Sequence, residues 1–424
     1  MPNSLRFTSN IKKEHLLTFY AITLFYFFES AQMSYFNVLA PSFLAHGGGH
    51  HQIASISAAY YYGCMIGLLP VGFALDYFPL RKILLWAIFG SVIGAVLLMA
   101  QNFYLQWVAR FICGFFGGTF SFMGGIKVLS NLFSNRFTFF MGLFLSAGMF
   151  GGLICQYPLL LTVNTMGIQT AIIIMAIFGF FVMGFNFFFL HPLSENNHPY
   201  KKRSSATQGN VRAYIAILKN YRNWLDCLMI VLLDTPVSII GTLWGIVILM
   251  SHYHLPDGIS AWIIMSLFSG LMVGLPLWGA LADKNNYPAW IIIIGSGASF
   301  LSLMLMLIIN NPSIIVLGCL FFGLGFFSSC QTLGFTWLTK NMRPELIGTN
   351  SALNSMVFMG TNGVFKQIGA YLLSIAPLVG ITSSSGNLLI LISGAMLFTT
   401  LYACVRGTLF NKVEKLFKEK LPTT

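Results

Sequence analysis

The chain has 424 residues, of which 56% are hydrophobic and only 8% are charged. A soluble domain carries about 25% charged residues, so this chain cannot cover a surface that faces water. Its formal net charge of +12 would suit a nucleic-acid partner, and the distribution of the basic residues along the chain decides that question.

Apolar stretches long enough to cross a bilayer recur along the whole chain. About 20 apolar residues cross the roughly 30 Å of hydrocarbon. The first stretch follows Arg6, Lys12 and Lys13, is too long for a signal peptide and lacks its cleavage site, so we expect it to be retained. We therefore predict an all-α integral membrane protein with twelve transmembrane helices, at residues 15–40, 53–75, 83–101, 104–130, 138–162, 169–190, 223–250, 259–281, 288–309, 314–338, 348–375 and 387–406.

Basic residues fall on one side of the predicted membrane. Lys and Arg are absent from the loops at 41–52, 101–103, 163–168, 251–258, 310–313 and 376–386. They occupy the opposite loops and both ends of the chain. Because positive charge stays in the cytoplasm, we predict a multi-pass protein of the inner (cytoplasmic) membrane with both termini cytoplasmic. The basic charge then reports topology and excludes a nucleic-acid partner.

One long hydrophilic segment divides the chain. Residues 191–222 contain "VRAYIAILKNY", which predicts an amphipathic helix on the membrane surface. We therefore expect an N-terminal six-helix bundle at 1–190, a cytoplasmic linker at 191–222, a C-terminal six-helix bundle at 223–406 and a basic cytoplasmic tail at 407–424.

Cysteines and histidines do not lead us to predict a metal site. The seven cysteines are scattered through the spans without paired spacing and are interpreted as small packing residues. His46, His50 and His51 in "HGGGHH" could bind a metal, but we interpret them as part of a solvated loop. We expect no cofactor, only a proton as the coupling ion.

The two halves of the chain repeat the same landmarks. The charged turn "VGFALDYFPLRK" at 71–82 returns as "LWGALADKNNYP" at 277–288. Two halves with matching landmarks indicate internal duplication, hence two pseudo-symmetric six-helix bundles with a binding site near mid-membrane at their interface. The matched pairs, 205 to 211 residues apart, are Gly72 with Gly279, Asp76 with Asp283, Glu29 with Asp234, and Gln156 with Gln367.

These turns carry a family resemblance. The pattern Gly72-x3-Asp76-x4-Arg81-Lys82 resembles the signature between helices 2 and 3 of the major facilitator superfamily, and Gly279-x3-Asp283-Lys284 resembles its weaker repeat between helices 8 and 9. The stretch "RFICGFFGG" at 110–118 is similar to the Arg-and-Gly pattern of helix 4. The resemblance covers essentially the whole chain and implies a transporter that works by alternating access.

Other features refine the resemblance. Tyr77 and Leu80 stand where the family commonly has a basic residue and a glycine. The fifth span, "SAGMFGGLICQYP", lacks the Gly-Pro pattern of many drug exporters, which favours uptake. This span and residues 326–373 resemble bacterial members that import small metabolites, among them phagosomal transporters of amino acids or nucleosides, and siderophore transporters.

The charged turns are expected to gate transport. Asp76 would pair with Arg81 and with helix ends of the other half in one conformation, and Gly72 would let a neighbouring helix approach. An exposed ion pair is worth about 0–1 kcal/mol, which suits a latch that opens in every cycle. The alternative is a cluster that only sets topology. The predicted gating residues are Gly72, Asp76, Arg81, Lys82, Gly279 and Asp283.

A few ionisable residues lie inside the predicted spans. A charge at mid-membrane costs about 2.5–3.5 kcal/mol, so such residues usually face a cavity. Lys127 and Asp226 lie near the cytoplasmic boundary, where snorkelling explains them. The predicted substrate-binding or coupling residues are Glu29, Gln32, Phe36, Arg110, Gln156, Asp234, Ser238, Lys366 and Gln367.

Three roles compete for Glu29 and Asp234. They could carry the coupling proton, hold a cationic group of the substrate, or form a structural ion pair such as Glu29 with Arg110. Lys366 could hold a carboxylate or phosphate, or neutralise Asp234 when the site is empty. Both acids together with Lys366 would suit a zwitterion.

The predicted function is therefore proton-coupled uptake of a small polar metabolite, with an amino acid, a nucleoside-like compound or a carboxylate as substrate. We expect a monomer in a lipid bilayer. The alternatives are a siderophore or drug/metabolite exporter of the same fold and a membrane receptor or sensor that does not transport. We expect no enzyme, because the sequence contains no metal-ligand cluster, nucleophile motif or phosphate-cradling loop.

Overall fold

The computed structural model describes residues 13–45, 47–100, 102–133, 137–190, 219, 221–284, 288–309, 311–334, 344–375 and 384–420, and these residues form helices joined by short turns. The helices of the N-terminal half (residues 13–190) are α1 (Lys13–Ser34), α2 (Phe36–Ala45), α3 (His50–Tyr77), α4 (Leu80–Leu97), α5 (Phe103–Ile112), η1 (Cys113–Gly118), α6 (Thr119–Leu132), α7 (Phe137–Ile154), α8 (Tyr157–Met166) and α9 (Ile168–Phe189). Those of the C-terminal half (residues 221–420) are α11 (Tyr221–Thr235), η5 (Pro236–Trp244), α12 (Gly245–His252), α13 (Asp257–Lys284), α14 (Pro288–Ile308), α15 (Ile314–Ser328), η6 (Ser329–Gln331), α17 (Pro344–Ser374) and α18 (Ser384–Lys420).

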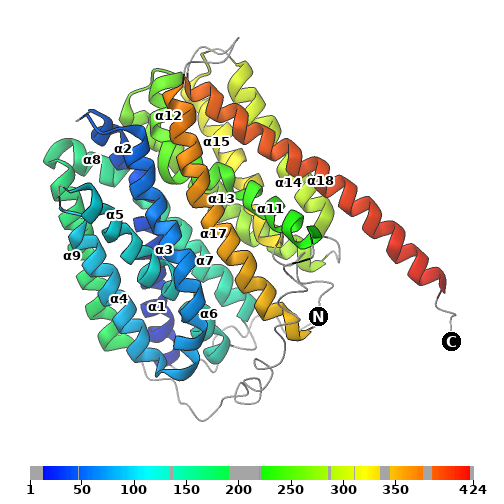
Figure 1. Cartoon of the computed structure of the whole chain (residues 1–424), viewed down its shortest axis with the longest axis horizontal. Helices are drawn as coiled ribbons and strands as arrows, with labels where there is room; N and C mark the ends of the chain where they lie inside the picture. Colours follow the sequence, from blue (N-terminus) through cyan, green and yellow to red (C-terminus); the bar gives the residue numbers. More distant parts are fainter. Residues whose placement is uncertain are drawn as a thin grey trace, which may run out of the picture.

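The helices of the two halves lie beside one another. In Figure 1 the blue and cyan helices of the N-terminal half stand next to the green, yellow and red helices of the C-terminal half. The helices α2, α8 and α12 lie at one end of the molecule, called the α2 end below. The helix α18 continues to Lys420, so it runs through most of the predicted tail at 407–424.

Ten helical stretches of the described chain are long and apolar enough to cross a membrane. The predicted spans at 15–40 and 348–375 are not among them, although α1 has 22 residues and α17 has 31. Both helices carry polar side chains in their middle, such as Glu29 and Gln32 on α1 and Asn362 and Lys366 on α17. The two helices that fall short in apolarity are thus rich in buried polar groups, and the count of twelve spans stays a prediction.

Several predicted spans are interrupted within the described chain. The span at 15–40 breaks at Tyr35, between α1 and α2, and the span at 138–162 breaks before Tyr157, between α7 and α8. The span at 223–250 contains the π-helix η5, which starts at Pro236. Proline lacks a backbone N–H, which loosens the α-helical hydrogen-bond pattern, and π segments occur frequently at functional sites.

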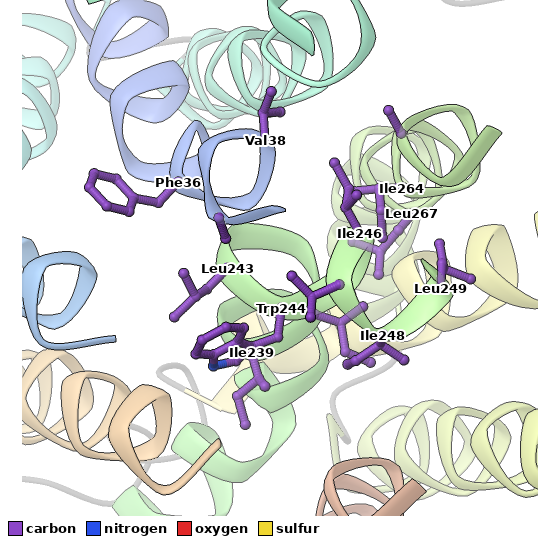
Figure 2. Close-up of a cluster of buried hydrophobic side chains, with 14 of the residues drawn as sticks. Phe36, Val38, Ile239, Leu243, Trp244, Ile246, Ile248, Leu249, Ile264 and Leu267 are labelled. Atoms are coloured by element: carbon purple, nitrogen blue, oxygen red, sulfur yellow. The ribbon is translucent and has the colours of Figure 1, made fainter. Parts of the chain in front are cut away.

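Three hydrophobic cores differ in which half of the chain supplies their residues. The largest contains residues of both halves and lies toward the α2 end, where α2, which carries Phe36 and Val38, lies beside η5 and α12 (Figure 2). A second core, around Phe28, contains only residues of the N-terminal half. A third core, around Trp278, contains only residues of the C-terminal half. The halves therefore share their largest core toward the α2 end, whereas the cores around Phe28 and Trp278 each belong to one half.

Glycines bring corresponding helix pairs of the two halves into contact. A Cβ atom on Gly63 of α3 would overlap the Phe111 carbonyl oxygen of α5, and one on Gly270 of α13 would overlap the Phe322 carbonyl oxygen of α15. Gly270 follows Gly63 by 207 residues, the spacing of the repeated charged turn. The same close packing is thus built in both halves, which fits an internal duplication.

Candidate functional site

Glu29 lies in a closely packed polar cluster of the N-terminal half. Its side chain is 1% exposed. Its Oε1 atom accepts hydrogen bonds from Gln32 Nε2 at 3.3 Å and from Ser91 Oγ, and Tyr60 donates to Oε2 at 3.5 Å. A Cβ atom on Gly117 would overlap the Glu29 carboxylate, so this glycine makes room for the acid. Gly117 belongs to the π-helix η1, within the "RFICGFFGG" pattern.

Arg110 is fully buried next to this cluster. Its Nη1 donates to the Gln32 carbonyl oxygen at 3.0 Å. The guanidinium carbon lies 5.1 Å from the ring centre of Tyr35, 4.9 Å from that of Phe36 and 4.7 Å from that of Tyr60. Aromatic faces attract a cation, so three rings hold the charge.

Lys366 is fully buried on the C-terminal half and contacts both halves. Its Nζ donates to Thr242 Oγ1 at 2.5 Å and to Ser57 Oγ at 3.1 Å, and it lies 4.8 Å from the ring centre of Tyr61. Tyr61 also hydrogen-bonds to Thr242 at 3.3 Å. Lys366 therefore links α17 and η5 to α3 of the other half.

Asp234 lies on α11 and is 6% exposed. Its Oδ2 accepts a hydrogen bond from Asn362 Nδ2 of α17 at 2.7 Å. The Ser238 hydroxyl, one helical turn further along, has no hydrogen-bond partner among the described residues. Asp234 is thus held by an amide and not by a cation.

The two ion pairs considered from the sequence for Glu29 and Asp234 are not formed among the described residues. Among the described residues, Glu29 does not pair with Arg110, because Arg110 donates to a backbone carbonyl and Glu29 accepts from Gln32, Ser91 and Tyr60. Lys366 does not neutralise Asp234 either, because its ammonium group is bound by two hydroxyl groups. The structure therefore brings two acids and two bases into one region without joining them.

The two predicted glutamines have different surroundings. Gln156 is buried and accepts a hydrogen bond from Asn37 Nδ2 at 3.0 Å. Gln367 is exposed and donates to the Tyr62 hydroxyl at 3.0 Å. Gln156 is thus part of the buried polar network, whereas Gln367 lies outside it on the α3–α17 contact.

Asn37 joins the interruptions of two helices across the halves. Its Nδ2 also donates to the Gly241 carbonyl oxygen at 3.1 Å, and its Oδ1 accepts from the Ile246 backbone N–H at 3.1 Å. Nearby, Asn164 Nδ2 donates to Asp257 Oδ2 at 2.6 Å. These bonds close the α2 end between the two halves.

Of the predicted gate, the structure describes the two glycines and the side chains of Arg81 and Lys82. Among the described residues, no atom of another helix lies within 4 Å of the position of a Cβ on Gly72 or Gly279, so the expected close approach at Gly72 is not met here. Arg81 Nη2 donates to the Phe187 carbonyl oxygen of α9 at 2.6 Å, a helix end of its own half. Lys82 is exposed. The side chains of Asp76 and Asp283 lie outside the described residues.

The remaining two ionisable residues have structural partners. Asp226 forms an ion pair of 2.8 Å with Arg406 of α18 and accepts from the Tyr402 hydroxyl at 2.6 Å. Lys127 donates to the Leu75 carbonyl oxygen near the end of α3. Lys127 therefore provides a donor for a backbone carbonyl at the end of α3. Asp226 joins α18 to α11 through its ion pair, a role that the snorkelling interpretation did not predict.

Sequence reasoning missed several polar residues of this region. Asn37, Ser57, Ser91, Thr242 and Asn362 are all buried and bind the predicted residues. Uncharged polar side chains are common in membrane helices. These five residues therefore could be recognised only once the structure showed which helices lie side by side.

Comparison with known proteins identifies the family. The model of the Major Facilitator Superfamily matches residues 22–365. The chain belongs to the major facilitator superfamily. As the sequence predicts, the protein is a multi-pass membrane transporter and not an enzyme.

Solved structures show the major facilitator fold as well. The D-xylose-proton symporter superposes with a TM-score of 0.71 at 15% identity, over 92% of this chain and 96% of that one. The nucleoside transporter NupG superposes with a TM-score of 0.70 at 12% identity, over 93% of this chain and 99% of that one. No curated protein sequence gives a significant match. At these identities the likeness establishes the fold alone, so the substrate has to be argued from the buried polar residues.

Proposed function

We propose that this protein takes up a small polar metabolite by alternating access, with the proton as the coupling ion. Its substrate would be an amino acid, a nucleoside-like compound or a carboxylate. The twelve predicted spans would form two six-helix bundles, at 1–190 and 223–406, joined by the linker at 191–222. The protein would act as a monomer in the inner membrane with both termini in the cytoplasm.

The observation that carries this proposal is the pair of buried carboxyl groups, one in each half, without a cation in contact. In the described chain, neither Glu29 nor Asp234 makes an ion pair. Ionisable residues inside membrane helices are costly and usually mark a path for an ion or a substrate. A carboxyl group that is held by hydrogen bonds alone can bind and release a proton when its surroundings change.

The arrangement of the cores supports alternating access. The two halves share one core at the α2 end, and the cores around Phe28 and Trp278 each belong to a single half. The predicted topology puts the α2 end outside the cell. This conformation would then be closed to the outside and open toward the cytoplasm, as one state of the cycle requires.

Glu29 is the residue to which we assign proton coupling. It lies at the meeting point of α1, α3, α4 and η1, so a change in its charge acts on four helical segments at once. Arg110, Asp234 and Lys366 would contact the substrate, supported by Gln32, Phe36, Gln156, Ser238 and Gln367. The D-xylose-proton symporter shows that this fold supports coupling to protons in another member.

Purified protein in liposomes tests the proposal. Uptake of radiolabelled amino acids, nucleosides and carboxylates would be measured with and without an imposed pH gradient. We expect one class to accumulate against its gradient, and Glu29→Gln to abolish this accumulation while passive exchange of the substrate persists.

The matched control is Glu14→Gln, because Glu14 lies on the same helix but is exposed. It should accumulate substrate like the unmodified protein. Undiminished accumulation by Glu29→Gln would refute the coupling role of Glu29, and transport of none of these classes would refute the proposed function.

A further inference from the structure

Arg110 has an unused hydrogen-bonding edge. Its Nη1 is bound to the Gln32 carbonyl oxygen, but Nε and Nη2 have no hydrogen-bond partner among the described residues. The Tyr35 hydroxyl also lies near the guanidinium group. The side chain is fully buried, so these two N–H groups are withdrawn from the surrounding solvent as well.

The two unused nitrogens share one side of the guanidinium. The N–H group of Nε and one N–H group of Nη2 point in the same direction, and their spacing matches the two oxygens of a carboxylate. Such paired bonds are the strongest contacts that arginine makes with anions. Glu29 does not fill this position: its oxygens accept from Gln32, Ser91 and Tyr60, and neither Nε nor Nη2 of Arg110 donates to it.

The surroundings of Asp234 have the opposite character. The amide nitrogen of Asn362 donates a hydrogen bond to Asp234, and Gln331 contacts the same carboxylate. The amide oxygens of both residues, Asn362 Oδ1 and Gln331 Oε1, have no donor among the described residues, and neither does the Ser238 hydroxyl. Unused acceptors beside a carboxylate suit a group that carries several N–H donors and a positive charge, such as an ammonium group.

The donor region and the acceptor region have neighbouring residues in common. The ring of Tyr60, on which Arg110 lies, is 5.9 Å from the ring of its neighbour Tyr61. Tyr61 lies within electrostatic reach of both Arg110 and Asp234, and so does Lys366. Unused donors in the N-terminal half and unused acceptors in the C-terminal half therefore flank the same residues.

We infer that the substrate is an amino acid, bound across the two halves with its carboxylate on the Nε and Nη2 edge of Arg110 and its ammonium group on the acceptors around Asp234. This inference rests on the proposed function and narrows it. It excludes nucleosides and sugars, which lack the carboxylate, and simple carboxylates, which lack the ammonium group. A ligand with a carboxylate and an ammonium group would bind Arg110 in one half and the acceptors around Asp234 in the other. Its binding therefore favours a state in which the two halves are closed around it.

Equilibrium binding to the full-length protein in detergent tests the inference without any transport step. Isothermal calorimetry and thermal shift would be run with the twenty proteinogenic amino acids, 4-aminobutyrate and 6-aminohexanoate. Uridine and D-xylose would serve as uncharged probes. For each amino acid that binds, its amide removes the carboxylate and its N-acetyl form removes the ammonium group. We expect each loss to weaken binding at least about tenfold, because each leaves buried charged groups unsatisfied.

Two variants assign the ends of the ligand. Arg110→Lys keeps the positive charge but loses the paired N–H edge, so it should weaken binding of the amino acid about tenfold and leave that of its amide unchanged. Asp234→Asn should weaken the amino acid about tenfold and spare its N-acetyl form. Arg406→Lys, which removes a guanidinium outside the region, should bind like the unmodified protein.

Several results would overturn the inference. The first is that uridine or D-xylose binds as tightly as any amino acid, and the second is that no amino acid binds. The third is that Arg110→Lys loses as much affinity for the amide as for the amino acid. The comparison of the amino acid with its amide and its N-acetyl form uses the unmodified protein, so it decides the question even where a variant fails to fold. If amino acids bind but never accumulate in liposomes, the proposed function fails and the site remains. If another class accumulates, the function holds and the site assignment fails.

Discussion

Asn37→Ala should shift the protein away from the conformation described here. The Asn37 side chain joins the halves through two hydrogen bonds of 3.1 Å, to the Gly241 carbonyl oxygen and from the Ile246 N–H. A buried hydrogen bond contributes about 1 kcal/mol net, so the two cross-links are worth about 2 kcal/mol to the closed α2 end. A difference of about 1.4 kcal/mol is tenfold in an equilibrium constant, so the closed population should fall roughly thirtyfold relative to the open one.

Distances between spin labels would report this shift. Tyr104 is the second residue of α5 and Ile315 is the second residue of α15, on opposite halves at the α2 end, and both side chains are exposed. Labels would be attached there after replacement of Cys319 and Cys404, the cysteines of the described chain that are not buried. In Asn37→Ala we expect the distance distribution to gain a longer component.

The control for this experiment is Asn186→Ala. Asn186 is equally buried but bonds to the Val182 carbonyl oxygen of its own helix, so its loss should leave the distances unchanged. An unaltered distribution in Asn37→Ala, with the protein folded, would show that these hydrogen bonds do not hold the α2 end closed.

Two further predictions concern glycines. Gly117→Ala should displace the Glu29 carboxylate and lower pH-driven uptake at least tenfold. The control Gly184→Ala should transport normally, because no atom of another described helix lies within 4 Å of its Cβ position. Equal activity of the two variants would contradict the packing described here. Gly63→Ala should lower the midpoint of thermal unfolding by several degrees, because its Cβ meets a backbone carbonyl of α5. The control Gly72→Ala should change the midpoint by no more than about a degree. The reverse order would refute the assignment of the close helix contact to Gly63.

The acidic residues of the site were predictable because charge is rare in this chain. Glu29 and Asp234 stand out in long apolar stretches, and their separation of 205 residues, close to the 207 of the repeated turn, marked them as a pair. Their partners were not predictable in the same way. Lys366 was expected either to hold a carboxylate or phosphate group or to neutralise Asp234, but its contacts are the hydroxyl groups of Ser57 and Thr242, which come from two other helices.

Helix interruptions were also beyond the reach of local sequence. The residues around Tyr35, "AQMSYFNV", include neither glycine nor proline, so the break between α1 and α2 reflects contacts made after folding. Asn37 illustrates this, because it serves the backbone of η5 and α12, about 200 residues later in the chain. The family pattern did locate Gly117 in "RFICGFFGG", yet its purpose became clear only from the position of the Glu29 carboxylate.

The core shared by the halves has a thermodynamic consequence. Opening the α2 end would separate side chains such as Phe36 and Leu243 and let water reach them, which raises heat capacity. The enthalpy of this step would therefore change with temperature, and an Arrhenius plot of the transport rate would bend. Cooling weakens hydrophobic contact, so the cold would favour the state with the α2 end apart.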